Sequence, residues 1–158
     1  MATIYRGTIS GKGVRVGIVI SRFNEIITKN LLDGALECLE QHNTDCNTIE
    51  VFWVPGSFEI PKAAKAAAET GKFDGVLCLG AVVRGDTPHF DYIAAEVTKG
   101  IAQINLQMSI PVVYGILTTD TVEQAIDRSG AKSGNKGWDA AITLLEMIDL
   151  IKKMKKSK

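Results

Sequence analysis

The chain alternates between short apolar runs and longer segments in which apolar residues recur with a helical period. Three short runs rich in Val and Ile have the length and composition of β-strands, at residues 14–20, 49–54 and 112–117. A fourth run, residues 76–83, is apolar throughout and is bounded by glycines. Such a run predicts a central strand that is buried on both faces of the sheet.

Apolar positions three or four residues apart predict helices between and after these strands. The first helix is expected from about Asn24 to Leu39, and the second has Ser57 as its N-cap and ends at Glu69. The other three are expected from about Ile93 to Met108, from Thr121 to Ser129 and from Asn135 to Lys153. Strands that alternate with helices indicate a parallel sheet with right-handed crossovers and helices on both faces. We therefore expect an α/β fold, a three-layer α-β-α sandwich around a four-stranded parallel sheet.

The N-terminal residues stand apart from this pattern. Residues 1–12 form an arm in which Thr3, Ile4 and Tyr5 have strand character but no obvious partner within the chain. An unpaired strand edge favours pairing with a neighbouring subunit. The length of 158 residues, without a linker or an internal repeat, predicts one domain over residues 1–158.

Composition narrows the functional class. The 18 basic and 18 acidic side chains balance, which argues against a nucleic-acid or membrane-surface partner. Hydrophobic residues make up 46% of the chain, which excludes disorder, and neither a membrane-spanning run nor a signal-peptide core is present. Cys38, Cys46 and Cys78 are odd in number and lack metal-ligand spacing, so we expect a cytoplasmic protein without a metal site. Cys78 is interpreted as a small core residue.

Polar and ionisable residues follow each predicted strand, at residues 21–24, 56–59, 84–89 and 118–120. In parallel sheets these carboxyl ends lie along one edge, where α/β proteins bind ligands. The segment after the central strand offers a cationic side chain, hydroxyl and carboxylate groups, and an imidazole just before a helix. The edge is therefore predicted to bind an anionic or carbonyl substrate.

Two aromatic residues and a histidine are the first candidates at this edge. Phe23 and Phe58 lie in loops and either sandwich a flat heterocycle or act as hydrophobic staples beside helix starts. A neutral imidazole can accept and donate a proton at cellular pH, as carbonyl chemistry requires. Because His89 follows the central strand, it is interpreted as a proton-transfer residue, whereas His42 is expected to complement a helix dipole.

Other charged motifs are ambiguous by themselves. Arg128, in the last turn of a short helix, is either a solvated cation at the helix C-terminus or a phosphate clamp, and its spacing favours the solvated cation. The segment 130–137 follows a helix rather than a strand, so it is not a P-loop. The Gly11-Lys12-Gly13 tripeptide precedes its strand and is no dinucleotide fingerprint.

Several blocks in order along nearly the whole chain resemble the lumazine synthase family of riboflavin biosynthesis. They are Ser21-Arg22-Phe23-Asn24, Val54 to Pro61, Leu79 to His89, Lys99-Gly100 and Gly130 to Gly137. The resemblance implies a flavodoxin-like fold and condensation of 5-amino-6-(D-ribitylamino)uracil with 3,4-dihydroxy-2-butanone 4-phosphate. The product would be 6,7-dimethyl-8-ribityllumazine, formed with loss of phosphate and water and without a metal or redox cofactor.

The same resemblance assigns roles to residues of this chain. Phe23 would stack on the pyrimidine, while Ser57, Phe58 and Glu59 would hold its ring and ribityl chain. Backbone contacts would come from Ala81, Val82 and Val83; Asp86 and Thr87 would meet the phosphorylated butanone, and His89 would transfer protons. Tyr114 and Arg128 would come from the adjacent subunit, with Arg128 gripping the phosphate and Lys136 assisting. This role of Arg128 reverses the interpretation from spacing.

Assembly and two rival functions complete the expectations. The family resemblance implies pentamers. Family members with a compact turn like 130–137 tend to form icosahedral shells of sixty subunits, so the resemblance also favours such a shell. It further suggests an association with riboflavin synthase. A flavodoxin-like or receiver-like binding module would share the fold, but a receiver needs clustered carboxylates where Ser21-Arg22-Phe23 stands. An inactive shell-forming or ligand-binding protein of the same fold is the alternative left open.

Overall fold

Four parallel strands form the centre of the structure, a computed structural model that describes residues 1–132 and 134–157. The strands are β1 (Val16–Ser21), β2 (Ile49–Val54), β3 (Gly75–Val83) and β4 (Val112–Thr119). Their order in the sheet is β2-β1-β3-β4, and Val16 of β1 lies opposite both Ile49 and Gly75. This is the strand order of flavodoxin-like sheets.

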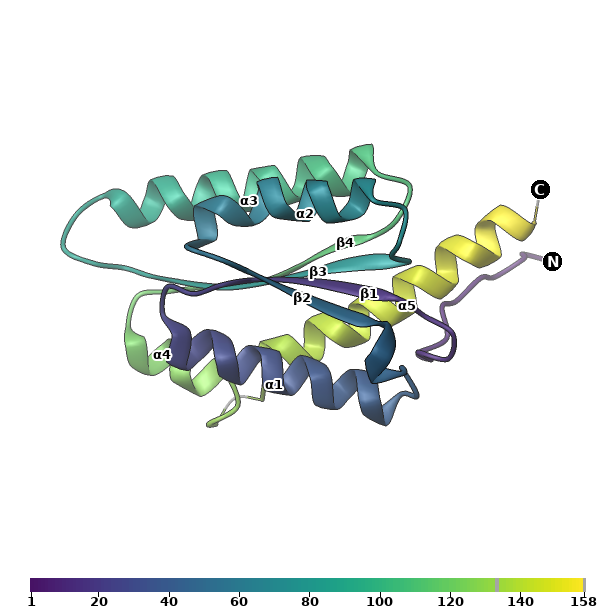
Figure 1. Cartoon of the computed structure of the whole chain (residues 1–158), viewed down its shortest axis with the longest axis horizontal. Coiled ribbons are helices and arrows are strands. Elements are labelled where there is room, and N and C mark those ends of the chain that lie inside the picture. The colour runs from purple at the N-terminus through teal and green to yellow at the C-terminus, as the bar shows by residue number, and fades with distance from the viewer. Residues whose placement is uncertain (133, 158) are drawn as a thin grey trace.

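Helices cover both faces of the sheet (Figure 1). Helices α1 (Glu25–Gln41), α4 (Val122–Arg128) and α5 (Lys136–Lys156) lie on one side, and α2 (Ile60–Glu69) and α3 (His89–Gln107) lie on the other. Two short 3₁₀ turns, Cys46–Thr48 and Ser57–Glu59, flank β2. Each face of the sheet has its own apolar core, so the predicted three-layer α-β-α sandwich is confirmed.

The central position of β3 follows from its composition. Val76, Leu77, Cys78 and Leu79 are fully buried, as the uninterrupted apolar run predicts. Burial raises the pKa of the Cys78 thiol to about 12, so this side chain stays protonated at neutral pH. The interpretation of Cys78 as a core residue is confirmed.

Some predicted boundaries differ from the structure. The strand β1 begins at Val16 rather than Val14, and Thr118 and Thr119 belong to β4 rather than to the loop after it. Ser57 does not cap α2; it begins the 3₁₀ turn that separates β2 from that helix. Because Pro61 occupies the first turn of α2 and has no N–H to satisfy, this helix needs one hydrogen-bond acceptor fewer at its start.

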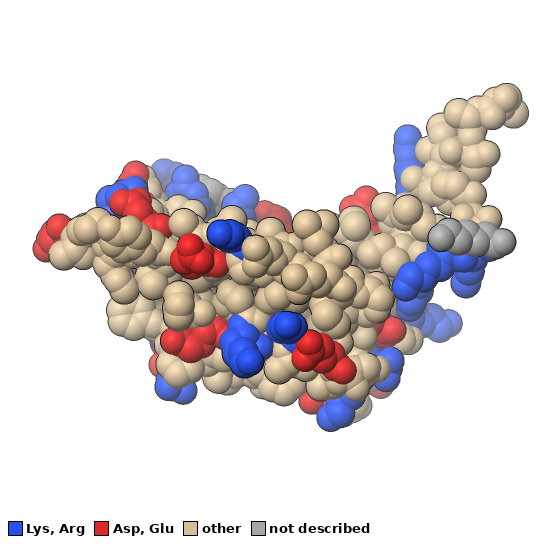
Figure 2. Space-filling model, turned by 90° about the horizontal axis from the view of Figure 1, so that it is seen from above, with Lys and Arg blue, Asp and Glu red and all other residues tan. Residues whose placement is uncertain are grey.

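The N-terminal arm has no strand of its own and lies along the end of α5. The Thr8 N–H donates to Asp149 Oδ2 at 2.7 Å, and Lys153 Nζ donates to the Arg6 carbonyl oxygen at 2.9 Å. Figure 2 shows Lys and Arg gathered at this end of the molecule. Ile4 is 74% exposed, so the apolar part of the arm remains available, and its pairing with a neighbouring subunit stays a prediction.

One asparagine fixes the turn between α4 and α5. Asn135 Oδ1 accepts from the backbone N–H groups of Gly137 at 2.8 Å and Trp138 at 3.2 Å, which caps α5. Its Nδ2 donates to the carbonyl oxygens of Asn30 and Ser129, at 2.9 and 3.1 Å. One side chain thus joins α5, α4 and α1. Ser133, within the same turn, and Lys158 lie outside the described residues.

We expect Asn135→Ala to lower the free energy of unfolding by about 2–3 kcal/mol, because it removes a helix cap and two further hydrogen bonds. Asn135→Ser keeps a cap acceptor but is too short to reach the two carbonyl groups, so its loss should be about half as large. Urea unfolding at one fixed protein concentration measures both. Equal losses for the two variants would contradict the bridging role.

Candidate functional site

A cavity of about 620 Å³ opens at the carboxyl ends of β1, β2 and β3. It lies beside the boundary between β1 and β3, where chain connections diverge to opposite faces of the sheet, the position at which α/β sheets bind ligands. Most of the predicted site residues line it: Phe23, Ser57, Phe58, Glu59, Ala81, Val82, Val83, Thr87 and His89. Three strand exits that are distant in sequence therefore meet in one cavity, as expected.

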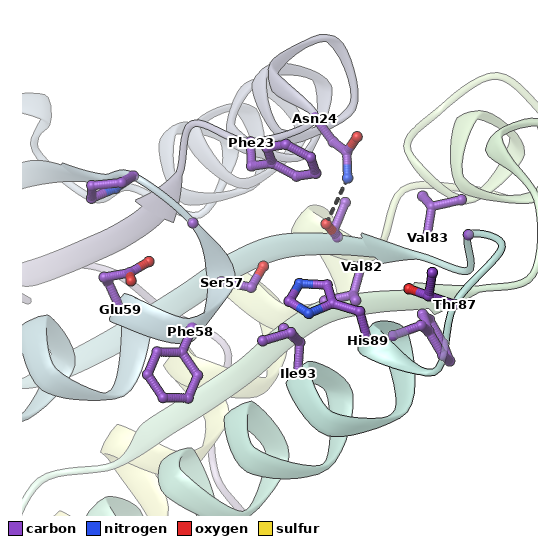
Figure 3. A pocket seen from close by; sticks show the side chains of 15 residues that line it. Phe23, Asn24, Ser57, Phe58, Glu59, Val82, Val83, Thr87, His89 and Ile93 are labelled. Carbon is purple, nitrogen blue, oxygen red and sulfur yellow. Dashed lines mark hydrogen bonds between the residues drawn. The ribbon is translucent and has the colours of Figure 1, made fainter.

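The two aromatic candidates both contribute to the cavity. Phe23 is 71% exposed and Phe58 is 58% exposed. In Figure 3 they lie on opposite sides of the opening, with Ser57 and His89 between them in this view. A hydrophobic staple would bury its ring against a helix. The exposure of both rings therefore favours contact with a flat ligand.

Asn24 positions Phe23 and was not predicted as a site residue. Its backbone is in the left-handed region, with φ of 62°, which Asn tolerates better than most residues. Its Nδ2 donates to the Ala81 carbonyl oxygen at 2.9 Å, so it joins the exit of β1 to β3 (Figure 3). The sequence feature that could have indicated this role is the Asn that directly follows Phe23.

Ser57 supplies an unpaired hydroxyl at the cavity wall. Its side chain is buried, with the residue 6% exposed, and Oγ finds no hydrogen-bond partner among the described residues. A Cβ on Gly80 would lie 2.9 Å from this Oγ, so the absence of a side chain at Gly80 leaves the hydroxyl its space. An unpaired buried hydroxyl in a cavity suits a polar ligand group. Glu59 lines the same cavity and is exposed.

His89 is the first residue of α3, and its exposed ring faces the cavity (Figure 3). The position at the N-terminus of a 19-residue helix places backbone N–H groups and the positive end of the helix dipole nearby. Thr87 lines the cavity from the preceding loop. Asp86 lies in that loop and is exposed, but it is not among the residues that line the cavity.

Arg84, the cationic side chain expected after the central strand, is paired with two carboxylates. Its Nε donates to Asp120 Oδ1 at 2.9 Å, and its Nη1 lies 3.3 Å from Asp91 Oδ1. The guanidinium also lies 4.4 Å from the ring centroid of Phe90. The hydrogen bond to Asp120 raises the pKa of Arg84 further above its ordinary value, with a contribution from Asp91. Sequence spacing could not predict this ion pair, because Arg84 follows β3 whereas Asp120 follows β4.

The remaining site candidates lie elsewhere on the chain. Tyr114, Arg128 and Lys136 line a second cavity of about 420 Å³ beside β4. Arg128 Nη1 donates to the Gln124 carbonyl oxygen at 3.1 Å, and Lys136 Nζ lies 3.8 Å from Asp139 Oδ2. None of the described residues that line the first cavity is Lys or Arg. Within this chain, the two groups of candidates form separate surfaces.

Two further observations concern metal binding and membrane crossing. No group of three or more His, Cys, Asp or Glu residues within the described ranges is arranged to hold a metal ion. Among the helices of residues 1–132 and 134–157, none combines the length and apolar character that crossing a membrane requires.

A comparison with known protein families identifies a match to most of the chain. The family model described as 6,7-dimethyl-8-ribityllumazine synthase matches residues 13–152 of the 158-residue chain. This range contains all four strands, all the residues of both cavities and nearly all of α5. The chain belongs to the 6,7-dimethyl-8-ribityllumazine synthase family.

Proposed function

We propose that this protein condenses 5-amino-6-(D-ribitylamino)uracil with 3,4-dihydroxy-2-butanone 4-phosphate to give 6,7-dimethyl-8-ribityllumazine, phosphate and water, in the cytoplasm. Membership of the family implies lumazine synthase activity, a transferase reaction of riboflavin biosynthesis. The observation that supports the full reaction is that the chain presents both an aromatic cavity lined by His89 and a separate cationic cavity lined by Arg128.

The condensation needs proton transfers and anion binding. An amine of the pyrimidine attacks the butanone carbonyl, water leaves as an imine forms, phosphate is eliminated, and ring closure with dehydration completes the second ring. The His89 imidazole can accept and donate the protons. Phe23 and Phe58 offer flat apolar surface to the pyrimidine, and Ser57 and Glu59 offer polar groups to its ring and ribityl chain.

The phosphorylated substrate requires a cation that the first cavity lacks among its described lining residues. Arg84 is paired with Asp120 and Asp91, whereas Arg128 and Lys136 line the second cavity. We therefore propose that Tyr114, Arg128 and Lys136 of one subunit complete the cavity of its neighbour. Arg128 suits the phosphate because its planar guanidinium can donate two parallel hydrogen bonds.

A site shared between neighbouring subunits requires an oligomer, and we propose the pentamer of the family. The turn after α4 supports a larger assembly. Gly130 and Gly134 have φ of 115° and 77°, and they allow the chain to reverse tightly between α4 and α5. On this compact turn we propose the sixty-subunit shell, and electron microscopy at physiological ionic strength tests it. A homogeneous pentamer without shells would contradict the shell but not the shared site.

The direct test of the proposed function is incubation of the pure protein with both substrates. The lumazine product should form with its characteristic absorbance and fluorescence, and omission of either substrate should abolish it. Binding of the pyrimidine without product formation would favour the inactive shell-forming or ligand-binding alternative.

His89→Asn should reduce turnover by about 10²-fold or less, at the low end of general acid–base effects. The loss should be modest because positioning of the two substrates supplies much of the acceleration. Steady-state kinetics measure turnover, and a binding titration with the pyrimidine, which should be nearly unchanged, serves as the control. Full turnover in His89→Asn would exclude the proton-transfer role.

Arg128→Ala should weaken binding of the phosphorylated substrate while pyrimidine binding is retained, because it removes a charge-assisted contact. Arg128→Lys should also be impaired, since an ammonium cannot reproduce the planar fork. Equal losses for both substrates in binding titrations would contradict this assignment.

Mixed assemblies test the sharing of sites between subunits. His89→Asn and Arg128→Ala subunits refolded together should recover activity, because some interfaces then join an intact cavity to an intact Arg128. Each variant refolded alone is the control. No recovery, with mixed assemblies verified by mass spectrometry, would place both residues in one subunit's site.

A further inference from the structure

We propose that Arg84 is a positioning residue that holds the loop 85–88 and the start of α3 in the conformation in which Thr87 and His89 face the cavity. It would do so through its two carboxylate partners, Asp120 and Asp91, and not by contact with substrate. This inference rests on the proposed condensation for its kinetic consequences, but its structural part can be tested without either substrate.

The loop has few other attachments. Residues 84–88 are all exposed, and a Cβ on Gly85 would have no neighbour within 4 Å. Among the described residues, no side chain of 85–88 forms a hydrogen bond or an ion pair. The backbone N–H of Arg84 donates to the Thr119 carbonyl oxygen at 2.9 Å, which ends the pairing of β3 with β4. Side-chain attachment of the loop therefore depends on Arg84.

The partners of Arg84 lie on both sides of the loop. Asp120 directly follows β4, and Asp91 lies in the first turn of α3, two residues after His89. One guanidinium thus joins the end of β3 to the end of β4 and to the helix that carries the imidazole. The same guanidinium lies over Phe90, whose ring lines the cavity. A planar group with several donors is needed to hold these partners at once.

The pairing also distinguishes positioning from direct binding of phosphate. If Arg84 contacted the phosphate, Asp120 and Asp91 would compete with the substrate, and removal of one carboxylate would strengthen binding. If Arg84 positions the loop, removal of the same carboxylate would weaken binding. The two roles therefore predict opposite effects of Asp120→Asn.

The experiment compares Arg84→Met, Arg84→Lys and Asp120→Asn. Arg84→Met and Asp120→Asn should each raise KM for the phosphorylated substrate about fivefold, the scale expected from loss of exposed ion pairs. The KM for the pyrimidine should stay unchanged, because Phe23, Ser57 and Glu59 come from the exits of β1 and β2. Arg84→Lys, which keeps the charge but not the fork, should show a smaller rise than Arg84→Met.

Arg15→Met is the matched control. Arg15 also forms an exposed ion pair with an aspartate, its Nε lying 3.7 Å from Asp74 Oδ2, but at the opposite end of the sheet. This variant should leave both KM values unchanged. A comparable rise in KM for Arg15→Met would mean that the Arg84 effect reflects general stability and would overturn the proposal.

Hydrogen exchange followed by mass spectrometry, without substrates, gives the second readout. Exchange in peptides that cover residues 84–91 should become about fivefold faster in Arg84→Met and Asp120→Asn, and should be unchanged in Arg15→Met. Unchanged exchange, or a KM lowered by Asp120→Asn, would overturn the positioning role. Faster exchange in a protein that forms no lumazine would retain the loop attachment and refute the condensation instead.

Discussion

The divergence of the chain at β1 and β3 is the constraint on which the rest of the structure depends. From β1 the chain crosses to α1 on one face of the sheet, and from β3 it crosses to α3 on the other. No helix can cover the sheet edge between these exits, so a cavity forms there. Because β3 is buried on both faces, its exit cannot shift without exposing apolar surface. The buried strand thus determines where the side chains of the following loop are presented.

The sequence predicted those features that depend on local pattern and on one rule of parallel sheets. The apolar run 76–83 identified the central strand, and the shared direction of the strands brought Phe23, Phe58 and His89 to one edge. The pairing of Arg84 with Asp120 could not be predicted. It depends on the register that sets Val83 opposite Thr119, and on residues 36 apart in the chain. The 3₁₀ turn at Ser57 was missed because Ser before a helix usually indicates a cap.

Two asparagines add hydrogen bonds between elements that also share the apolar core on one face of the sheet. Asn24 ties the start of α1 to β3, and Asn135 ties the start of α5 to α1 and to the end of α4. Both amides donate through Nδ2 to backbone carbonyl oxygens, and Asn135 also accepts through Oδ1. Asn24 fixes the cavity wall, while Asn135 fixes the turn that precedes Lys136 in the second cavity. The two halves of the proposed shared site are thus held by similar means.

The buried hydroxyl of Ser57 has a consequence for selectivity among related ligands. Its oxygen is buried and has no protein partner among the described residues, so a ligand that bonds to it would satisfy a group that the protein itself leaves unpaired. A flat analogue that fills the same volume with hydrocarbon would leave the oxygen unpaired, a penalty of about 1–3 kcal/mol. Stacking between aromatic rings tolerates many heterocycles, whereas the Ser57 oxygen favours only those that place a hydrogen-bonding group beside it. Discrimination between similar compounds would therefore depend on this oxygen beside Gly80 as well as on the polar groups of Glu59 and His89.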